Sequence, residues 1–170
     1  MHKRRERVGG APRRVPQALD EALGFNLYQV ALLFRRDLMR ALAQHGLTPE
    51  QWQILVALEE RGEGLRQTEV AALTMKDKHS VSRIVARMEA AGWVKRSGDP
   101  ADGRAVMVQP TPKSRKALKP MLRSLDTHFR RVNGTLSLAE RHQLLGLLRR
   151  LRAELEDVEP TGQSSPSSSQ

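Results

Sequence analysis

The feature that most constrains the fold is a change in the spacing of apolar residues after Gly92. Up to that glycine, apolar side chains recur every three or four residues, as in amphipathic helices, and one helix is predicted to run unbroken over residues 17–44. After it, residues 93–96 and 105–108 are short β-prone runs separated by turn formers. Helical spacing then returns. The pattern predicts a mainly α fold with a small β-hairpin.

Capping residues mark where several of the predicted helices begin. Thr48 is followed three residues later by Gln51, and Ser137 by Glu140, which is the spacing of a capping box. Asp77 is placed to cap the helix that Gly92 ends.

Two short helices precede the hairpin, the first over residues 67–73 and the second beginning after Asp77. Residues 74–76 separate them. The second helix has a narrow apolar stripe and a polar, basic opposite face. Short helices joined by such a turn are typical of a helix-turn-helix, and a hairpin directly after them makes it a winged helix-turn-helix.

The charge of the 170-residue chain is strongly positive, with 29 Lys and Arg against 19 Asp and Glu. Residues 1–16 carry much of the excess and few apolar side chains, which predicts a disordered basic arm. Residues 159–170 are rich in serine and proline, which predicts a disordered tail. A further basic face over residues 113–131 is either solvated or attracts nucleic acid through its field. The body between the arm and the tail spans residues 17–158.

Several function classes are excluded or disfavoured by composition. The chain has no cysteine, so disulfides, thiolate metal sites and thiol redox sensing are excluded. No apolar run is long enough to span a membrane, and no apolar stretch follows the basic start, so we expect neither a membrane partner nor secretion but a cytoplasmic protein. The pattern around residues 62–67 lacks the third glycine and the preceding strand of a dinucleotide loop. The histidines lack the spacing of a hydrolytic zinc site. We therefore expect no enzyme, no metal and no cofactor.

The residues that carry a family resemblance extend over most of the body. They are residues 47–52, 67–71, 77–85, 88–96 and the hairpin residues 99–106, in order. In this series the chain resembles the MarR-type transcriptional regulators, named for the multiple antibiotic resistance regulator. It departs from them at Arg66, where a small capping hydroxyl residue is common, and at Gly103, where many members have a second arginine.

The resemblance implies a homodimer that binds a palindromic operator in double-stranded DNA. Residues 17–45 and 111–158 would form the dimerisation region and residues 47–110 the DNA-binding lobe. Such regulators are usually repressors, and they often release DNA when a small phenolic or carboxylate effector binds. The long first helix and the leucine-rich last helix fit this expectation, since they offer more apolar surface than a small winged domain covers.

Roles for individual residues follow from this interpretation. Gln67 and Thr68 would contact phosphates, Arg83 would contact a guanine, and Arg104 at the hairpin tip would enter the minor groove with Asp102 holding it in place. The remaining candidates for DNA contact are Lys76, Lys78, His79, Ser80, Ser82, Arg87 and Arg96. The candidate effector pocket consists of Tyr28, His45 and Trp52.

One alternative remains open at this point. An activator, or an architectural protein that binds any duplex through its basic segments without a small-molecule effector, would have the same charge distribution. The ratio of specific to non-specific affinity separates these hypotheses, whereas salt dependence alone does not.

Overall fold

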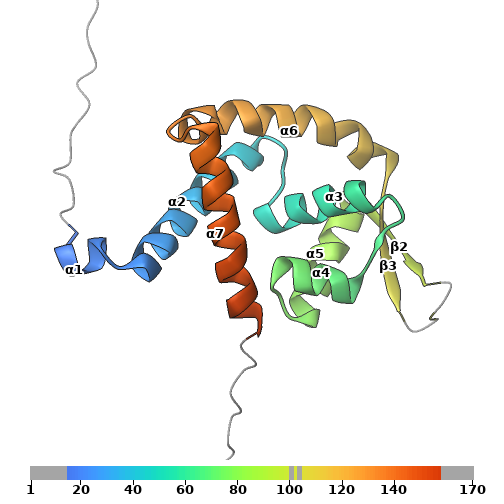
Figure 1. Ribbon diagram of the computed structural model, residues 1–170. Helices are drawn as coiled ribbons and strands as arrows, with labels where there is room; N and C mark the ends of the chain where they lie inside the picture. Colours follow the sequence, from blue (N-terminus) through green and yellow to red (C-terminus); the bar gives the residue numbers. More distant parts are fainter. Residues whose placement is uncertain (1–14, 100–101, 103–104, 158–170) are drawn as a thin grey trace, which may run out of the picture. The chain divides into compact units, whose positions relative to one another are not determined.

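The computed structural model describes residues 15–99, 102 and 105–157. Most of the predicted basic arm, Arg104 and the Ser/Pro tail lie outside these residues. The chain divides into two compact units, one reaching Leu125 and the other starting at Asp126. The fold is mostly helical with a small antiparallel sheet, as the sequence predicts (Figure 1).

The first helix departs from its prediction. Residues 17–44 form a short α1 (Gln17–Asp20) and a long α2 (Leu23–Ala43) instead of one unbroken helix. Ala22 between them has extended backbone angles, and the side-chain amide of Asn26 donates to the carbonyl oxygens of Asp20 at 2.6 Å and Ala22 at 3.0 Å. Asn26 thus binds two carbonyl oxygens at the break between the helices. The apolar spacing of the sequence did not reveal this break.

The helix-turn-helix and hairpin follow the predicted order. The elements are α3 (Pro49–Arg61), β1 (Leu65–Arg66), α4 (Gln67–Thr74), α5 (Lys78–Ala90), β2 (Val94–Gly98) and β3 (Val106–Pro110). Strand order is β1-β3-β2, both pairings are antiparallel, and the β2–β3 hairpin is the wing. The two-residue β1 was not predicted, because a strand that short shows no alternation. Gly64 before it has φ +110°, and a Cβ there would lie 2.9 Å from the Val108 carbonyl oxygen. Glycine therefore lets the chain pass close to β3.

The core of the lobe lies where α3, α4 and α5 meet the sheet. Its fully buried side chains include Ile54, Leu58, Val70, Val81, Val85, Met88, Val94 and Val108. The helix α6 (Pro112–Asn133) starts against the end of α5. There, the Lys113 Nζ donates to the Ala91 carbonyl at 2.6 Å and lies 4.3 Å from the centre of the Trp93 ring. The start of α6 is thereby fastened to the junction of α5 and the wing.

The helix α6 is amphipathic, as predicted. It buries Leu118, Met121 and Leu125 and continues through Pro120, which lies inside the helix and is exposed. Its basic side chains at positions 113, 115, 116, 119 and 123 are exposed.

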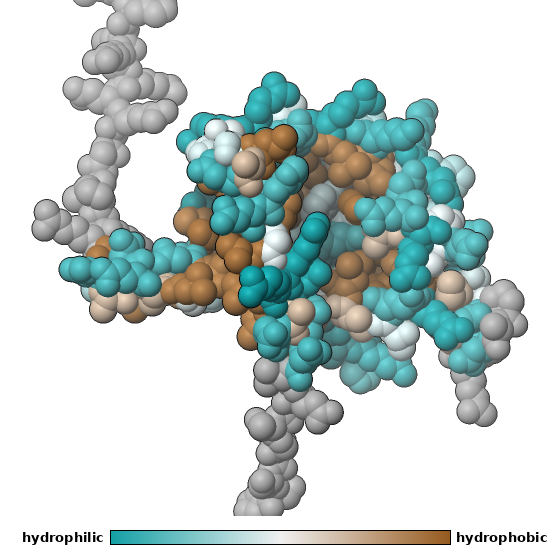
Figure 2. Space-filling view, in the orientation of Figure 1, coloured by the Kyte–Doolittle hydropathy of each residue, from teal (hydrophilic) through white to brown (hydrophobic). Residues whose placement is uncertain are grey.

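Large apolar side chains are exposed on two helices, each considered by itself. On α2 they are Leu23, Tyr28, Val30, Leu32, Leu33, Phe34 and Met39, and Figure 2 shows apolar surface along this helix. On α7 (Leu138–Asp157) they are Leu138, Leu144, Leu145, Leu147, Leu148 and Leu155, and no described residue of this helix is buried. Such faces are unusual on a monomer.

None of the helices in the described part of the chain is long and apolar enough to cross a membrane.

Candidate nucleic-acid interface

The turn between α4 and α5 is shaped by Met75, which ends α4. It has φ +52°, a left-handed conformation that is uncommon for a side chain of this size, and it is almost fully exposed. Thr74 directly before it is buried and its hydroxyl donates to the Val70 carbonyl at 2.7 Å. The left-handed residue thus ends α4, and only three residues separate this helix from α5.

Asp77 fixes the start of α5. Its carboxylate accepts the backbone N–H of Ser80 at 2.9 Å and the Ser80 hydroxyl at 2.7 Å. These two hydrogen bonds lower the pKa of Asp77 from 3.8 to about 2. The predicted cap is confirmed. Because the Ser80 hydroxyl donates its proton to Asp77, Ser80 can act toward DNA only as a hydrogen-bond acceptor.

The exposed face of α5 is polar and basic. Val81, Ile84, Val85 and Met88 are buried on the opposite side of the helix. Lys78, His79, Arg83 and Arg87 are exposed, and Ser80 and Ser82 are half-buried. Within the described residues none of the four exposed side chains has an ion-pair partner. Their donors are therefore available to phosphates and base edges.

The first turn of α4 and the turn before α5 supply further candidates. Gln67 is half-buried and Thr68 exposed, both at the helix N-terminus, where backbone N–H groups favour anions. Lys76 is exposed. This placement is compatible with the phosphate contacts predicted for these residues.

Arg96, another predicted DNA contact, forms an ion pair within the protein. Its guanidinium donates to Glu89 Oε2 through Nε at 2.7 Å and through Nη2 at 2.6 Å, and its backbone N–H donates to Glu89 Oε1 at 2.9 Å. These bonds hold the pKa of Glu89 below its usual value. Through this pair Arg96 links β2 to α5, and a contact of Arg96 with DNA stays a prediction.

Two residues that sequence reasoning did not assign to the site anchor the wing as well. Arg66 pairs with Asp99 at 2.7 Å, and the Asp99 side chain is buried. The unusual residue type at position 66 was visible in the sequence, but its partner 33 positions away was not. Asp102 is exposed and its proposed partner Arg104 lies outside the described residues.

A cavity of about 370 Å³ lies beside α5. It is lined by Thr48, Glu50, Lys76, Ser80, Arg83, Ile84 and Arg87. Three of these side chains are cationic, and the same three are candidates for DNA contact.

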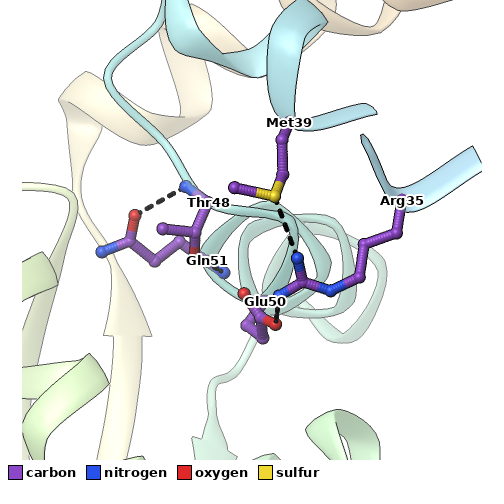
Figure 3. A network of polar contacts seen from close by, with 5 residues as sticks. All are labelled: Arg35, Met39, Thr48, Glu50 and Gln51. Atoms are coloured by element: carbon purple, nitrogen blue, oxygen red, sulfur yellow. Dashed lines mark hydrogen bonds and ion pairs between the residues drawn. The ribbon is translucent and has the colours of Figure 1, made fainter. Parts of the chain in front are cut away.

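The carboxylate of Glu50 in this cavity is tied to α2. Arg35 Nη2 donates to Glu50 Oε1 at 2.7 Å, and Arg35 Nη1 donates to the Met39 sulfur at 2.9 Å. Both contacts are drawn in Figure 3. The neighbouring Thr48 and Gln51 form the predicted capping box. Burial raises the pKa of Glu50, but hydrogen bonds from its own backbone N–H, Arg35 and Thr48 outweigh burial and lower it.

The three predicted effector-pocket residues have differing surroundings. Tyr28 is exposed, whereas His45 and Trp52 are half-buried. The His45 Nε2 and Trp52 Nε1 atoms are buried and have no hydrogen-bond partner among the described residues. None of the three lines either of two cavities in the lobe, the one beside α5 and another of about 410 Å³ near Lys95 and Arg115.

Clusters of histidine and carboxylate side chains able to hold a metal ion do not occur among the described residues.

Comparison with known proteins decides the family. The sequence model described as MarR family matches residues 45–105. The HTH-type transcriptional regulator TtmR of Methylorubrum extorquens (strain PA1) is 34% identical over 161 residues, covering 89% of this chain and 81% of TtmR. The chain belongs to the MarR family. Its MarR-family homologues are transcriptional regulators and not enzymes.

Solved structures agree with the MarR winged-helix fold. CouR from Rhodococcus jostii RHA1 bound to p-coumaroyl-CoA is 26% identical with a TM-score of 0.72, covering 80% of this chain and 95% of CouR. The transcriptional repressor CouR bound to a 23-mer DNA duplex is 27% identical with a TM-score of 0.73. The match covers 80% of this chain and 96% of CouR.

Proposed function

We propose that this MarR-family protein is a homodimeric repressor that binds a palindromic operator through α5. The exposed face of α5 carries the proposal, because Lys78, His79, Arg83 and Arg87 present donors that no described carboxylate neutralises. Two copies of α5 related by a twofold axis would enter successive major grooves about 34–36 Å apart. CouR, which has the same fold, has been solved on a DNA duplex.

The exposed apolar faces of α2 and α7 support the homodimer. Their leucines, valines and aromatic rings are exposed in the single chain. A second copy of the chain would cover identical faces on both protomers at once, as a twofold interface requires.

An operator footprint tests the repressor hypothesis. DNase protection of the DNA flanking the protein's own coding region should reveal an inverted repeat, and a reporter placed behind that repeat should be less active when the protein is present. Protection without sequence preference would favour the architectural alternative. A reporter that becomes more active would favour an activator.

Arg83 is the residue we propose for base discrimination. In the Arg83→Ala variant we expect the loss of about 1–3 kcal/mol of preference at one base pair in each half-site, because a bidentate guanine contact is removed. Arg123→Ala is the matched control, since Arg123 is exposed on α6 and has no ion-pair partner among the described residues. Equal effects of both substitutions on every DNA sequence would remove Arg83 from base recognition.

We further propose that a small aromatic carboxylate releases the DNA. Lys76, Arg83 and Arg87 surround the cavity beside α5, so a carboxylate bound there would occupy cations that otherwise face phosphates. The released fraction would depend on how much more tightly the effector binds the DNA-free state.

His45 and Trp52 are the second candidate effector position, because each has a buried nitrogen without a hydrogen-bond partner among the described residues. A screen of aromatic acids by thermal shift and operator release finds the effector. If the effector binds in the cavity beside α5, Arg87→Ala should weaken its binding. If it binds at His45 and Trp52, Trp52→Phe should weaken its binding instead. No release by any aromatic acid would contradict the effector hypothesis.

A further inference from the structure

Arg66 is the N-cap residue of α4, but its side chain is unable to cap the helix. Serine, threonine or aspartate would accept a backbone N–H there, whereas a guanidinium has only donors. The backbone N–H of Arg66 instead donates to Glu69 Oε2 at 2.8 Å, which provides one half of a capping box. The guanidinium points elsewhere. Its Nε and Nη2 atoms both lie 2.7 Å from Oδ2 of Asp99.

Asp99 is placed where the two strands of the wing come together at the end of the hairpin. Its backbone N–H donates to the Ala105 carbonyl at 3.0 Å, and its carbonyl accepts the N–H of Asp102 at 3.2 Å. The Asp99 side chain is only 7% exposed, whereas that of Arg66 is 46% exposed. The carboxylate that receives the arginine is thus built into the end of the hairpin, away from solvent.

This pair joins the end of the wing to the start of the helix-turn-helix. Arg66 is the last residue of β1 and directly precedes α4, and its backbone pairs with Met107 of β3. The Glu89–Arg96 pair joins β2 to α5 in the same way. Each helix of the helix-turn-helix is therefore linked to the wing by an arginine–carboxylate pair, of which the Arg66 pair lies nearer the tip.

We propose that Arg66 is a positioning residue that sets how the wing approaches DNA, and thereby the sequence preference beside each half-site. The inference rests on the proposed operator binding. Removing one member of a pair whose carboxylate is buried is unfavourable, so the end of the hairpin would rearrange when the guanidinium is lost. The face of α5 would stay in place, because Asp77 and the buried side of the helix hold it.

The test uses the full-length protein with Arg66→Ser as the main variant. Serine restores a normal N-cap, so a change in the wing is separated from a loss of α4. Arg66→Lys keeps the charge, and the exchange Arg66→Asp with Asp99→Arg rebuilds the pair with the charges reversed. Binding is measured on operators randomised either in the half-site core or in its flanks, with Arg104→Ala defining which flank positions depend on the wing. Hydrogen exchange of the β2 and β3 amides provides a measurement that needs no DNA.

For Arg66→Ser we expect a loss of about fivefold to tenfold in preference at the flank positions, which is the lower end of the cost of one mismatched base pair, with the core preference unchanged. Amides of β2 and β3 should exchange faster, and the charge exchange and Arg66→Lys should restore part of the flank preference. Unchanged flank preference, or an equal loss in core and flanks, would overturn this inference alone. A wild-type protein without any sequence preference would overturn the proposed function, and this inference with it.

Discussion

Two leucines of α7 allow the proposed dimer to be tested quantitatively. Leu144 and Leu148 are one helical turn apart and 42% and 37% exposed in the single chain. Together they expose about four-fifths of one leucine. Full burial of a leucine side chain stabilises by about 1.5–3 kcal/mol, and a twofold interface contains each residue twice. Allowing for the methyl group that alanine retains, the Leu144→Ala and Leu148→Ala double variant should weaken the dimer by about 2–4 kcal/mol.

That loss corresponds to a dimer dissociation constant raised about 30-fold to several hundredfold, which sedimentation equilibrium resolves. Operator affinity should fall in parallel at low protein concentration, because a single lobe reads only one half-site. The control is the double variant His142→Ala and Arg149→Ala, which changes exposed residues on the other side of the same helix. A folded Leu144/Leu148 variant, verified by circular dichroism, whose dissociation constant matches the wild type would refute the assignment of this face to the dimer.

Three further predictions concern the lobe and the arm. The pKa of Glu50 is lowered, so the stability that its pair with Arg35 contributes is present above about pH 4.5 and is lost as the pH falls through the lowered pKa. Denaturant unfolding between pH 7 and 3 should therefore show a shallower pH dependence in Glu50→Gln, and parallel curves would contradict this. Gly64→Ala should destabilise by about 1–3 kcal/mol and more than Gly62→Ala, because both glycines have positive φ but only Gly64 lacks room for a Cβ. Equal melting temperatures for the two variants would disprove the close approach to β3. Deleting residues 1–16 should weaken binding to all DNA sequences and reduce the salt dependence of affinity, and an unchanged salt slope would show that the arm makes no phosphate contacts.

Local signals explain which parts of the fold could be predicted from the sequence. Caps such as Thr48 with Gln51, Asp77, and Ser137 with Glu140 act within four residues, so their helix starts were predicted and confirmed. The break between α1 and α2 was missed because apolar spacing is insensitive to one extended residue. The two-residue β1 exists only through its pairing with β3.

The candidate site was predictable in composition but not in its internal pairings. The exposed cations of α5 follow from helical periodicity, whereas the pairing of Arg96 with Glu89 depends on how β2 folds back on the helix. The Arg66–Asp99 pair requires the tertiary fold as well, since no local rule connects residues 33 positions apart. Charge alone therefore led to the prediction that Arg96 contacts DNA, and it did not reveal the pairing of Arg96 with Glu89.

The two tryptophans of the chain lie in different surroundings, and this makes them separate optical reporters. Trp93 is packed beneath Lys113 where α5, the wing and α6 meet. Trp52, near the start of α3, has a buried indole N–H that finds no hydrogen-bond acceptor in the described part of the chain, although buried indoles usually find one. In a Trp93→Phe variant the fluorescence therefore comes from Trp52 and reports on ligands that reach this indole. In Trp52→Phe it comes from Trp93 and reports on the base of the wing. The protein can thus be observed at two points without an attached dye.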